Sequence, residues 1–580
     1  MNNSNNIAPR VALLFIAIVT LLMGSSLYKV VQLKVSPPDK LANATGSVTS
    51  TTRQLALRGK IFDRQGRLLA ASRIGIKLFV DAKEIQNVES LSLTLGEILS
   101  IPPAEIEEEL RRKATKRYIV IKELLNDTEV NAIKEFKEHT AQRQCVGLEE
   151  VLVREYPHGG IGGPLIGIVG TDHKGLAGFE SIFENVLAGT PGKFVRIRDT
   201  KKNTIWVSPI GLTPKTNGKN VQLSIDVVIQ EIAYRRLQEE VIRCNAGGGR
   251  ILVVEPQTGE ILAMADVLNH RDGWTQQPED ANRKMDPRLG RNRCVTDPYE
   301  PGSTFKPFIW SYATQLGKVT PDEILQTPTL ANGPYRTSFD RTIRDAHYYG
   351  PSTWKNVLIK SMNSGMAIVA QRLSYAQLQE ALKRFGFGET TRVGLGGETR
   401  GIVTNPSSWG DWTQTSVPMG QEIAVTPLQM VQGFCAFARD GTVPQLKLKP
   451  STDEDVMFIR KAITPEIAAL TRQIMGQVMT EGTGRNSQSD LYALFGKSGT
   501  AQLPDAEGKE YFEDRYIASF IAGAPIDNPK LVVLCVIDDP DKSIGHYGGV
   551  VAGPVVRDVI EETLQYLRVP VSSEFLANAN

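Results

Sequence analysis

Cysteine is scarce in this chain: its 580 residues include five cysteines, with no C-x-x-C pair and no cluster with histidine. This scatter disfavours a zinc ribbon, a thioredoxin-like redox site and a disulfide-dense fold. No metal-ligand cluster is visible elsewhere in the sequence, and the pairing of the cysteines stays open. The five positions are Cys145, Cys244, Cys294, Cys435 and Cys535.

An excess of charge of one sign is also lacking. There are 66 Lys and Arg against 64 Asp and Glu, a net charge of +2, whereas nucleic-acid scaffolds usually show a strong basic excess or stripe. With 41% hydrophobic and 22% charged residues, the composition is that of an ordinary globular protein, neither disordered nor a multi-span membrane protein. At roughly 150 residues per domain, the length predicts three or four domains, or two large ones.

One uncharged apolar run lies near the N-terminus, at residues 11–27. Its length is at the lower limit for a helix that crosses roughly 30 Å of hydrocarbon. A cleaved signal peptide is the alternative, but no A-x-A cleavage site follows. We therefore predict a retained single-pass anchor at residues 10–33, after a tail at residues 1–9.

The orientation of this anchor depends on the charges at its flanks. Arg10 and the α-amino group favour a cytoplasmic N-terminus, although Lys29 and Lys34 on the other flank weaken the signal. With the tail inside, everything after about residue 30 lies outside the cytoplasm, at the periplasmic side of the inner membrane.

Composition divides the rest of the chain. Residues 34–52 are rich in Pro, Ser and Thr and predict a linker. A change near residue 216 separates a domain at 53–215 from a second one at 216–568. The last residues, 569–580, predict a frayed tail.

Within the first domain, residues 58–70 contain two short apolar runs around a Gly, which predicts a hairpin. Residues 88–143 are charge-rich with helical spacing, which is typical of solvated helix faces. The Gly-rich stretch at 154–192 predicts turns that join short strands.

The second domain shows strands first, helices in the middle and strands last. Residues 221–241 begin as a strand and continue as a helix, and residues 249–266 predict a second hairpin. This order implies an α+β domain whose sheet takes its strands from distant parts of the chain, with helices packed against it. The later helical patterns cover 303–318, 354–386, 424–439, 464–480 and 554–568, and the later strands 516–524 and 531–538.

Ser303 and Lys306 have the spacing S-x-x-K. A turn precedes them, and Pro307 is tolerable only near a first helical turn, so a helix must begin close to Ser303. The hydroxyl then lies at the positive end of the helix dipole, which favours a developing alkoxide. Lys306 lies on the same face, within reach of that hydroxyl.

The same spacing also arises by chance, and two further pairs, Ser26…Lys29 and Ser352…Lys355, match it. A lysine is useful as a base only when its pKa falls toward neutrality, through burial or a second cation. Lys497 would be that cation if the fold brings it near.

Two more short elements follow. Ser361-Met362-Asn363 predicts a helix cap or a loop, and Lys497-Ser498-Gly499-Thr500 suits the edge of a sheet. Gly499 would let a substrate backbone approach closely, and the amide of Thr500 could point at an oxyanion.

In this order, the three elements resemble the signature of penicillin-interacting serine enzymes. The segment from Tyr299 to Pro307 is similar to the nucleophile segment of class B penicillin-binding proteins, the monofunctional peptidoglycan D,D-transpeptidases. Ser498 replaces the more usual Thr. Further stretches resemble that family at 58–70, 175–180, 223–230, 255–265, 426–429 and 547–554.

The resemblance implies an α+β multidomain fold. It would have a single N-terminal transmembrane helix, an elongated β-rich pedestal domain and a C-terminal penicillin-binding domain. That last domain would be a serine β-lactamase-like transpeptidase domain, with an antiparallel sheet and helices on both faces. No metal or organic cofactor is implied.

The resemblance also implies residue roles. Ser303 would be the nucleophile, Lys306 the base and Ser361 a proton relay to the leaving amine. Asn363 would hold the donor peptide, and the other predicted binding residues are Lys497, Ser498, Gly499 and Thr500. The amides of Ser303 and Thr500 would form the oxyanion hole.

The implied function is cross-linking of peptidoglycan stem peptides, of a division type, with β-lactams as covalent inhibitors. The implied partners are stem peptides, the cell membrane, a membrane-embedded glycan polymerase and divisome proteins, and no nucleic acid. One alternative is a D,D-carboxypeptidase or β-lactamase, and another is an idle scaffold or β-lactam sensor. Division or elongation, the acceptor amine and the oligomeric state stay open.

Overall fold

The computed structural model describes residues 7–36, 38, 49–140, 144–198, 204–269, 290–451, 458–504 and 511–572. The chain forms two compact units, and each is built from segments that are distant in the sequence. The first unit consists of Met1–Leu57, Ile74–Leu152 and Gly189–Gly218, and the second of Arg58–Arg73, Val153–Ala188 and Lys219–Asn580.

These units divide the chain differently from the predicted domains. The predicted boundary at 215/216 lies close to Gly218, where the first unit ends. Segments 58–73 and 153–188, however, belong to the second unit. The buried ion pairs of Arg58 and Arg154 with Glu180 join them to each other, and Arg67 pairs with Asp226 of the main segment. Sequence order alone could not separate these segments from their neighbours.

The first unit begins with the helix α1, Ile7–Val35, of which Val11–Val35 is long and apolar enough to span a membrane. The helix is slightly longer at both ends than the predicted anchor at 10–33. The predicted tail at 1–9 lies outside the described residues up to residue 6. The other elements that begin in this unit are β1 (Thr49–Gln54), α3 (Val88–Leu99), α4 (Pro103–Arg112), β4 (Ile119–Lys122), α5 (Asp127–His139), β5 (Val146–Glu155), β6 (Gly192–Arg198) and β7 (Thr204–Thr213).

The helices α3, α4 and α5 pack on strands in one small core. Its buried residues include Leu95 of α3, Leu110 of α4 and Ile133 of α5, together with Leu78 at the end of β3 (Leu68–Val80). Asn126 and Glu129 form a capping box at the start of α5. The exposed charges of α4 confirm the predicted solvated helix face at 88–143 for that helix, whereas Glu129 of α5 is buried.

The strands β1, β6 and β7 form a separate antiparallel sheet with β6 in the centre. Because β1 begins at Thr49, the predicted linker at 34–52 ends before its expected boundary. Most of that linker lies outside the described residues.

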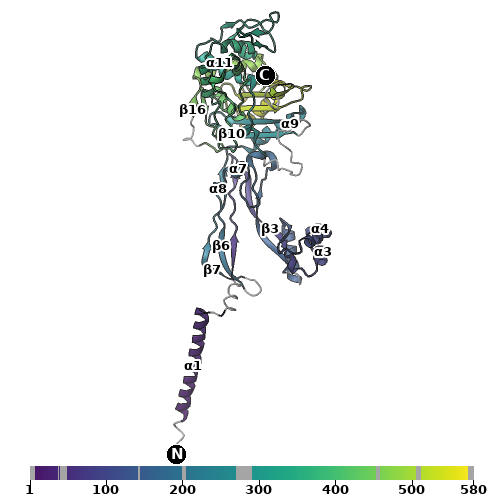
Figure 1. The fold of residues 1–580 in the computed structure, drawn as a ribbon, viewed down its shortest axis with the longest axis vertical. Helices are drawn as coiled ribbons and strands as arrows, with labels where there is room; N and C mark the ends of the chain where they lie inside the picture. Colours follow the sequence, from purple (N-terminus) through teal and green to yellow (C-terminus); the bar gives the residue numbers. More distant parts are fainter. Residues whose placement is uncertain are drawn as a thin grey trace, which may run out of the picture. The chain divides into compact units, whose positions relative to one another are not determined.

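The second unit contains a five-stranded antiparallel sheet in the order β10-β9-β19-β18-β17. As predicted, the strands come from both ends of the domain, and the C-terminal strands lie beside β9 (Figure 1, yellow beside teal). The bounds are β9 Gly248–Glu255, β10 Glu260–Leu268, β17 Phe495–Pro504, β18 Tyr511–Ala524 and β19 Leu531–Asp538.

Helices cover both faces of this sheet. Alternate residues of β19 enter opposite cores, with Leu534 in one and Val533 in the other. The helices α9 (Val227–Arg243) and α19 (Gly553–Tyr566) contribute to the second core. The first core takes residues from α11 (Lys306–Gln315), α12 (Trp354–Ile359), α13 (Asn363–Ala370), α14 (Tyr375–Phe385), α16 (Pro427–Ala438) and α17 (Pro465–Glu481).

The remaining elements of the second unit are short. The helices are α6 (Gly163–Ile166), α7 (Gly178–Ile182), α8 (Glu184–Leu187), α10 (Arg293–Thr296), α15 (Asp411–Ser416) and α18 (Gly548–Val551). The strands are β2 (Ile61–Phe62), β8 (Val221–Gln222), β11 (Ile324–Leu325), β12 (Tyr335–Arg336), β13 (Thr342–Ile343), β14 (Ser352–Thr353), β15 (Thr442–Pro444) and β16 (Phe458–Lys461).

Two predicted hairpins are confirmed, because β2 pairs with β3 and β9 with β10. The prediction of short strands at 154–192 was largely wrong. Apart from the end of β5 and the start of β6, that stretch forms a 3₁₀ turn at Gly159–Gly162 and the short helices α6, α7 and α8. It also makes two isolated bridges, Val169–Gly175 and Thr190–Thr216. Glycines with positive φ, such as Gly163 and Gly178, interrupt the backbone there.

The prediction of a frayed tail at 569–580 was wrong for its first residues. The carbonyl of Val569 accepts from the Tyr492 hydroxyl at 3.0 Å, and Ser572 N donates to Leu491 O at 3.0 Å. These bonds satisfy backbone groups that a frayed end would leave to water. Residues 573–580 lie outside the described part of the chain.

Candidate active site

Ser303 lies in a 3₁₀ turn, Gly302–Phe305, directly before α11. Pro307 occupies the first turn of α11, so the helix begins beside Ser303 as the sequence predicted. The Ser303 side chain is half-buried, whereas Thr304 and Lys306 on either side of Phe305 are buried. Within the described residues, the Ser303 hydroxyl makes no hydrogen bond, so its proton and lone pairs are available.

The turn of Ser303 packs against the edge strand β17 at van der Waals distance. Gly302 has φ +54°, and a Cβ there would lie 3.0 Å from the carbonyl oxygen of Thr500. A Cβ on Gly499 would lie 2.7 Å from the carbonyl oxygen of Pro301. Both positions therefore require glycine, and this close packing places the turn of Ser303 beside the strand of Lys497.

Lys306 is fully buried and faces the loop between α12 and α13. Its Nζ donates to the carbonyl oxygen of Ser361 at 2.6 Å and to Asn363 Oδ1 at 2.7 Å, and lies 3.3 Å from Ser361 Oγ. Ser361 has φ +60°, in the left-handed region. This backbone turn breaks the helical pattern predicted at 354–386, which forms three helices instead of one.

Lys497 reaches the same serine from the opposite side. It is fully buried on β17, where its Nζ lies 2.9 Å from Ser361 Oγ, 3.1 Å from the carbonyl oxygen of Ser498 and 3.5 Å from Thr483 Oγ1. Strand alternation directs Lys497 to the same face as its cross-strand partner Ile521, which belongs to the first core. The Ser361 hydroxyl thus bridges two buried amines.

Burial lowers the pKa of both lysines. The pKa of Lys306 falls to about 7, because desolvation outweighs the attraction of the Asp345 carboxylate. The pKa of Lys497 falls well below its ordinary value, through burial and through repulsion from Lys306. The sequence argument had expected Lys497 to be the cation that lowers the pKa of Lys306. In the structure, burial is the main cause for both lysines, and repulsion between the two amines lowers the pKa of Lys497 rather than that of Lys306.

The other predicted binding residues have partners of their own. Ser498 Oγ hydrogen-bonds to Thr483 Oγ1 at 2.8 Å. Thr500 Oγ1 accepts from the amide of Gly548 at 3.1 Å, at the start of α18, and can still donate its own proton. The structure therefore brings all eight predicted residues into one neighbourhood of α11, the α12–α13 loop and β17.

Sequence reasoning missed Asp345 and Thr483. Asp345 Oδ1 accepts hydrogen bonds from the amide of Ser364 at 3.0 Å and from the amide of Asn363. Asp345 thus caps the start of α13 from a distant loop. The Asp345 carboxylate also raises the pKa of Lys306 by attracting its positive charge. Both residues lie in segments without a recognisable spacing, so no signal in a single sequence could have identified them.

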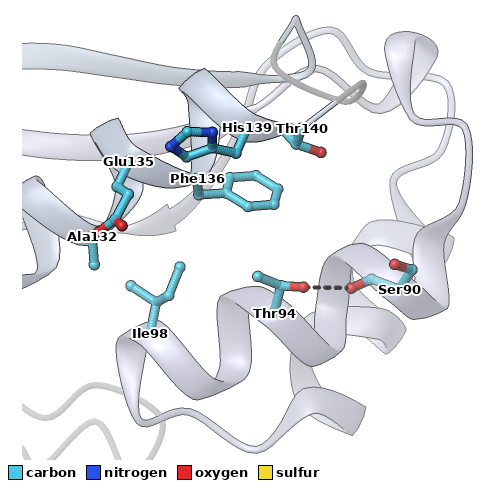
Figure 2. A pocket seen from close by; sticks show the side chains of 8 residues that line it. All are labelled: Ser90, Thr94, Ile98, Ala132, Glu135, Phe136, His139 and Thr140. Carbon is cyan, nitrogen blue, oxygen red and sulfur yellow. Dashed lines mark hydrogen bonds between the residues drawn. The ribbon is translucent and has the colours of Figure 1, made fainter.

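A cleft in the first unit has a different character (Figure 2). It lies between α3 and α5, has a volume of about 510 Å³ and is open to solvent. Phe136 and Ile98 line it beside Thr94, whose hydroxyl donates to the backbone of its own helix at Ser90. His139 and Glu135 also line it, but among the described residues no hydrogen bond or ion pair joins them into a reactive pair.

Two known protein families match the chain. The family described as "Penicillin binding protein transpeptidase domain" matches residues 249–561, and "Penicillin-binding Protein dimerisation domain" matches residues 53–223. The "Probable peptidoglycan D,D-transpeptidase PenA" of Neisseria meningitidis is 31% identical over 544 residues, 90% of this chain and 87% of that protein. The "Peptidoglycan D,D-transpeptidase FtsI" of Escherichia coli is 29% identical over 576 residues, 98% of this chain and 93% of that protein.

Solved structures show the same similarity. A peptidoglycan synthetase from Bifidobacterium adolescentis is 25% identical with a TM-score of 0.66, and 90% of this chain covers 98% of that one. Penicillin binding protein 3 from Mycobacterium tuberculosis, complexed with aztreonam, is 25% identical with a TM-score of 0.65 and the same coverage.

Proposed function

The chain belongs to the penicillin-binding protein transpeptidase family, and on that premise we propose that it cross-links peptidoglycan stem peptides as a serine D,D-transpeptidase. The observation that carries the residue assignment is the pair of fully buried lysines, Lys306 and Lys497, that share the Ser361 hydroxyl beside the turn of Ser303. Such an arrangement keeps an amine neutral near physiological pH, which a general base requires.

Acylation begins with the Ser303 hydroxyl. Its oxygen attacks the carbonyl carbon of the penultimate D-alanine, while its proton passes to the neutral amine of Lys306. The negative charge that develops on the carbonyl oxygen is stabilised by the backbone amides of Ser303 and Thr500. The C–N bond then breaks, the terminal D-alanine leaves with a proton on its amine, and Ser303 holds the peptide as an ester.

The proton for the leaving amine travels through Ser361. Its Oγ accepts from Lys306 and donates to the departing nitrogen, and Lys497 holds it from the other side at 2.9 Å. Because Lys306 is regenerated as a neutral amine, it can serve again when the acceptor amine attacks the ester. That second attack forms the cross-link and frees Ser303.

The substrate's own carboxylate sets the charges of the two lysines. A carboxylate beside Lys497 favours the ammonium form of that residue. The chain Lys306–Ser361–Lys497 offers a route by which a proton moves from Lys306 to Lys497 on binding. Substrate binding thereby leaves Lys306 neutral and Lys497 charged, which is the state that acylation needs.

Asn363 and the β17 edge hold the donor peptide. Asn363 accepts from Lys306 and donates to the carbonyl oxygen of Arg344 at 2.9 Å, so its amide is fixed next to the site. The hydroxyls of Ser498 and Thr500 bind the terminal carboxylate together with Lys497. Gly499 allows the peptide backbone to lie directly on the strand.

We place the reaction outside the cytoplasm, in division. The helix α1 would anchor the chain with its N-terminus in the cytoplasm, and a membrane-embedded glycan polymerase and divisome proteins would be its partners. The similarity to a relative named FtsI supports the division role. Cross-linking and co-purification of the full chain from membranes would test these partners.

Covalent labelling with fluorescent penicillin tests the site. We expect the full chain to be labelled and Ser303→Ala to lose labelling completely, with mass spectrometry locating the adduct on Ser303. Ser352→Ala is the matched control, because Ser352 has the same S-x-x-K spacing but its hydroxyl donates to the carbonyl oxygen of Gly350. Labelling that persists in Ser303→Ala, or that is lost in Ser352→Ala, contradicts the assignment.

The rate at which the adduct decays separates the transpeptidase from the alternatives. A long-lived penicillin adduct, with cross-linked product from paired stem peptides, supports the transpeptidase. Rapid turnover of penicillin would instead indicate a hydrolase, and a stable adduct without any cross-linked product would indicate a sensor.

A further inference from the structure

The strand β7 exposes apolar side chains on both of its faces. Ile205 is 66% exposed, Trp206 51% and Val207 45%. Neighbouring residues of a strand point to opposite faces, so neither face of the β1-β6-β7 sheet covers them. Among the described residues, none of the three hydrophobic cores takes a side chain from these strands.

Such a patch needs an environment outside the sheet. Single exposed apolar residues are ordinary, but three consecutive ones that include Trp, exposed on both faces at one end of a strand, mark an interaction surface. The strand β7 is also an edge strand, with one side of its backbone unpaired in the described sheet.

The course of the chain connects this patch to the membrane helix. In the sheet, Thr49 pairs with Ile197 and Ile197 with Trp206, whereas the far end pairs Gln54 with Gly192. The chain that leaves α1 at Val35 therefore joins the sheet at the end that carries Ile205, Trp206 and Val207. The intervening residues 36–48 span at most roughly 50 Å when fully extended, which keeps this end within reach of the bilayer.

The chemistry of this end fits a lipid headgroup layer. Trp is an amphipathic ring that favours the membrane–water interface. The sequence from 192 to 213 contains five Lys or Arg and one Asp. Arg196 pairs directly with Val207 across the sheet. Basic residues near a bilayer are attracted to anionic lipids.

We propose that Ile205, Trp206 and Val207 form a membrane-contact patch that lies in the headgroup region of an anionic phospholipid bilayer. The inference rests on the proposed membrane anchoring by α1, and it adds a second point of contact with the same bilayer. Two contacts restrict the orientation of the first unit at the bilayer more than one anchor helix does.

Site-directed spin labelling of the full chain in phospholipid vesicles tests this patch. The five native cysteines are all buried, so Ile205→Cys and Leu212→Cys can each be labelled selectively. Leu212 is the matched control: it is 54% exposed on the same strand, roughly 23 Å further along. We expect the label at 205 to be more accessible to oxygen than to a polar nickel complex, and the label at 212 to show the reverse.

Lipid charge gives a second, independent readout. In vesicles that contain phosphatidylglycerol, the immersed fraction at 205 should exceed that in phosphatidylcholine alone. In the anionic vesicles, Arg196→Gln should lower the ratio of labels at 205 that are immersed in the bilayer to labels that are in water roughly fivefold. Lys193→Gln, at the far end of β6 opposite Thr213, should lower it less.

Each other outcome overturns the proposal. A label at 205 that the nickel complex reaches freely in anionic vesicles shows a solvated patch. A label that neither probe reaches shows that protein, either a partner or a second copy of the chain, covers it. Vesicle flotation and fluorescent penicillin labelling of the same sample separate the causes. A chain that reacts with fluorescent penicillin but does not float with the vesicles contradicts both the anchor and this inference. That result leaves the transpeptidase assignment intact.

Discussion

Two of the antiparallel sheets in the described part of the chain have opposite surroundings. The five-stranded sheet of the second unit is covered by helices on both faces, and all eight residues of β19 are buried. The three-stranded sheet β1-β6-β7 contributes to none of the cores among the described residues, and Ile205, Trp206 and Val207 of β7 are exposed. Similar apolar strands therefore serve different purposes: one builds a dry interior, and the other presents a surface.

The difference also explains where reactive groups can exist. A lysine on the covered sheet, such as Lys497, loses its water and changes its pKa. A cation on the uncovered sheet, such as the exposed Lys193, remains hydrated and acts only through its charge. A lysine with a lowered pKa, which can act as a base, therefore requires the covered five-stranded sheet, whereas the cations of the sheet β1-β6-β7 can only attract opposite charge.

The largest effect is expected from removal of the buried base. Lys306→Ala should slow acylation by penicillin by about 10²- to 10⁴-fold, because a general base contributes that much. Stopped-flow labelling measures the rate, and Lys355→Ala in the chance S-x-x-K pair is the control, since Lys355 pairs with Asp322 at the surface. An unchanged acylation rate in Lys306→Ala would remove the role of Lys306 as base.

Removal of a buried charge in the covered sheet should cost nearly as much. Arg293 is buried between Asp266 and Asp538, at 2.6 and 2.7 Å. Arg293→Leu leaves the buried carboxylate of Asp266 without its partner and leaves Asp538 with Arg250 alone. It should lower the free energy of unfolding by roughly 3–5 kcal/mol.

The control for that variant is Arg235→Ala, which breaks a partly exposed pair with Glu562 and should cost no more than about 1 kcal/mol. Loss of penicillin labelling with increasing urea measures the unfolding of the second unit. Equal urea midpoints for Arg293→Leu and Arg235→Ala would mean that burial does not determine how much these ion pairs contribute to stability.

Matched truncations compare the two sheets directly. Leu534→Ala on β19 should destabilise its unit by roughly 2–5 kcal/mol, because it leaves a cavity. Val207→Ala on β7 should change stability by no more than about 0.5 kcal/mol. Hydrogen exchange of the strand amides reports each local opening free energy. A large loss at Val207 would show that the three-stranded sheet has a core after all.

The smallest effect is a shift in pH dependence. The pKa of Lys306 is about 7 in the fold, so acylation should rise as the pH increases through about 7 and the amine becomes neutral. Between this value and the ordinary lysine pKa of about 10.4, the unfolded chain binds more protons at this position than the folded chain does. The contribution of Lys306 to stability therefore increases with pH across that window.

Asp345→Asn tests the cause of that pKa. The carboxylate raises the pKa of Lys306, so its removal should move the rise in acylation rate to lower pH. Asp322→Asn, on the surface, should leave the profile unchanged. A shift toward higher pH in Asp345→Asn would contradict the electrostatic role of Asp345.

Much of the fold followed from local patterns. The helix start at Ser303 was predictable because Pro307 restricts the backbone, and the hairpins at 58–70 and 249–266 because glycine turns separate apolar runs. The Gly-rich stretch at 154–192 was mistaken for strands, because glycine marks a turn without indicating what the turn connects.

The site was predictable only in its parts. The three motifs were recognisable as spacings, and their family resemblance implied that they meet. The role of Asp345 depends on a loop that reaches α13 from 19 residues away, and that of Thr483 on contacts with Lys497 and Ser498. Contacts of this kind leave no periodicity in a single sequence.

The amino-acid sequence by itself determined the apolar N-terminal helix, the alternation of the strands and the identities of the serine and the two lysines, because these depend on local composition and spacing. Only the tertiary structure decided that both amines lose their water and share one hydroxyl, and that the apolar residues of β7 stay exposed. The physical reason is that desolvation depends on what packs around a group, and most of the groups that surround Lys306 and Lys497 come from distant parts of the chain.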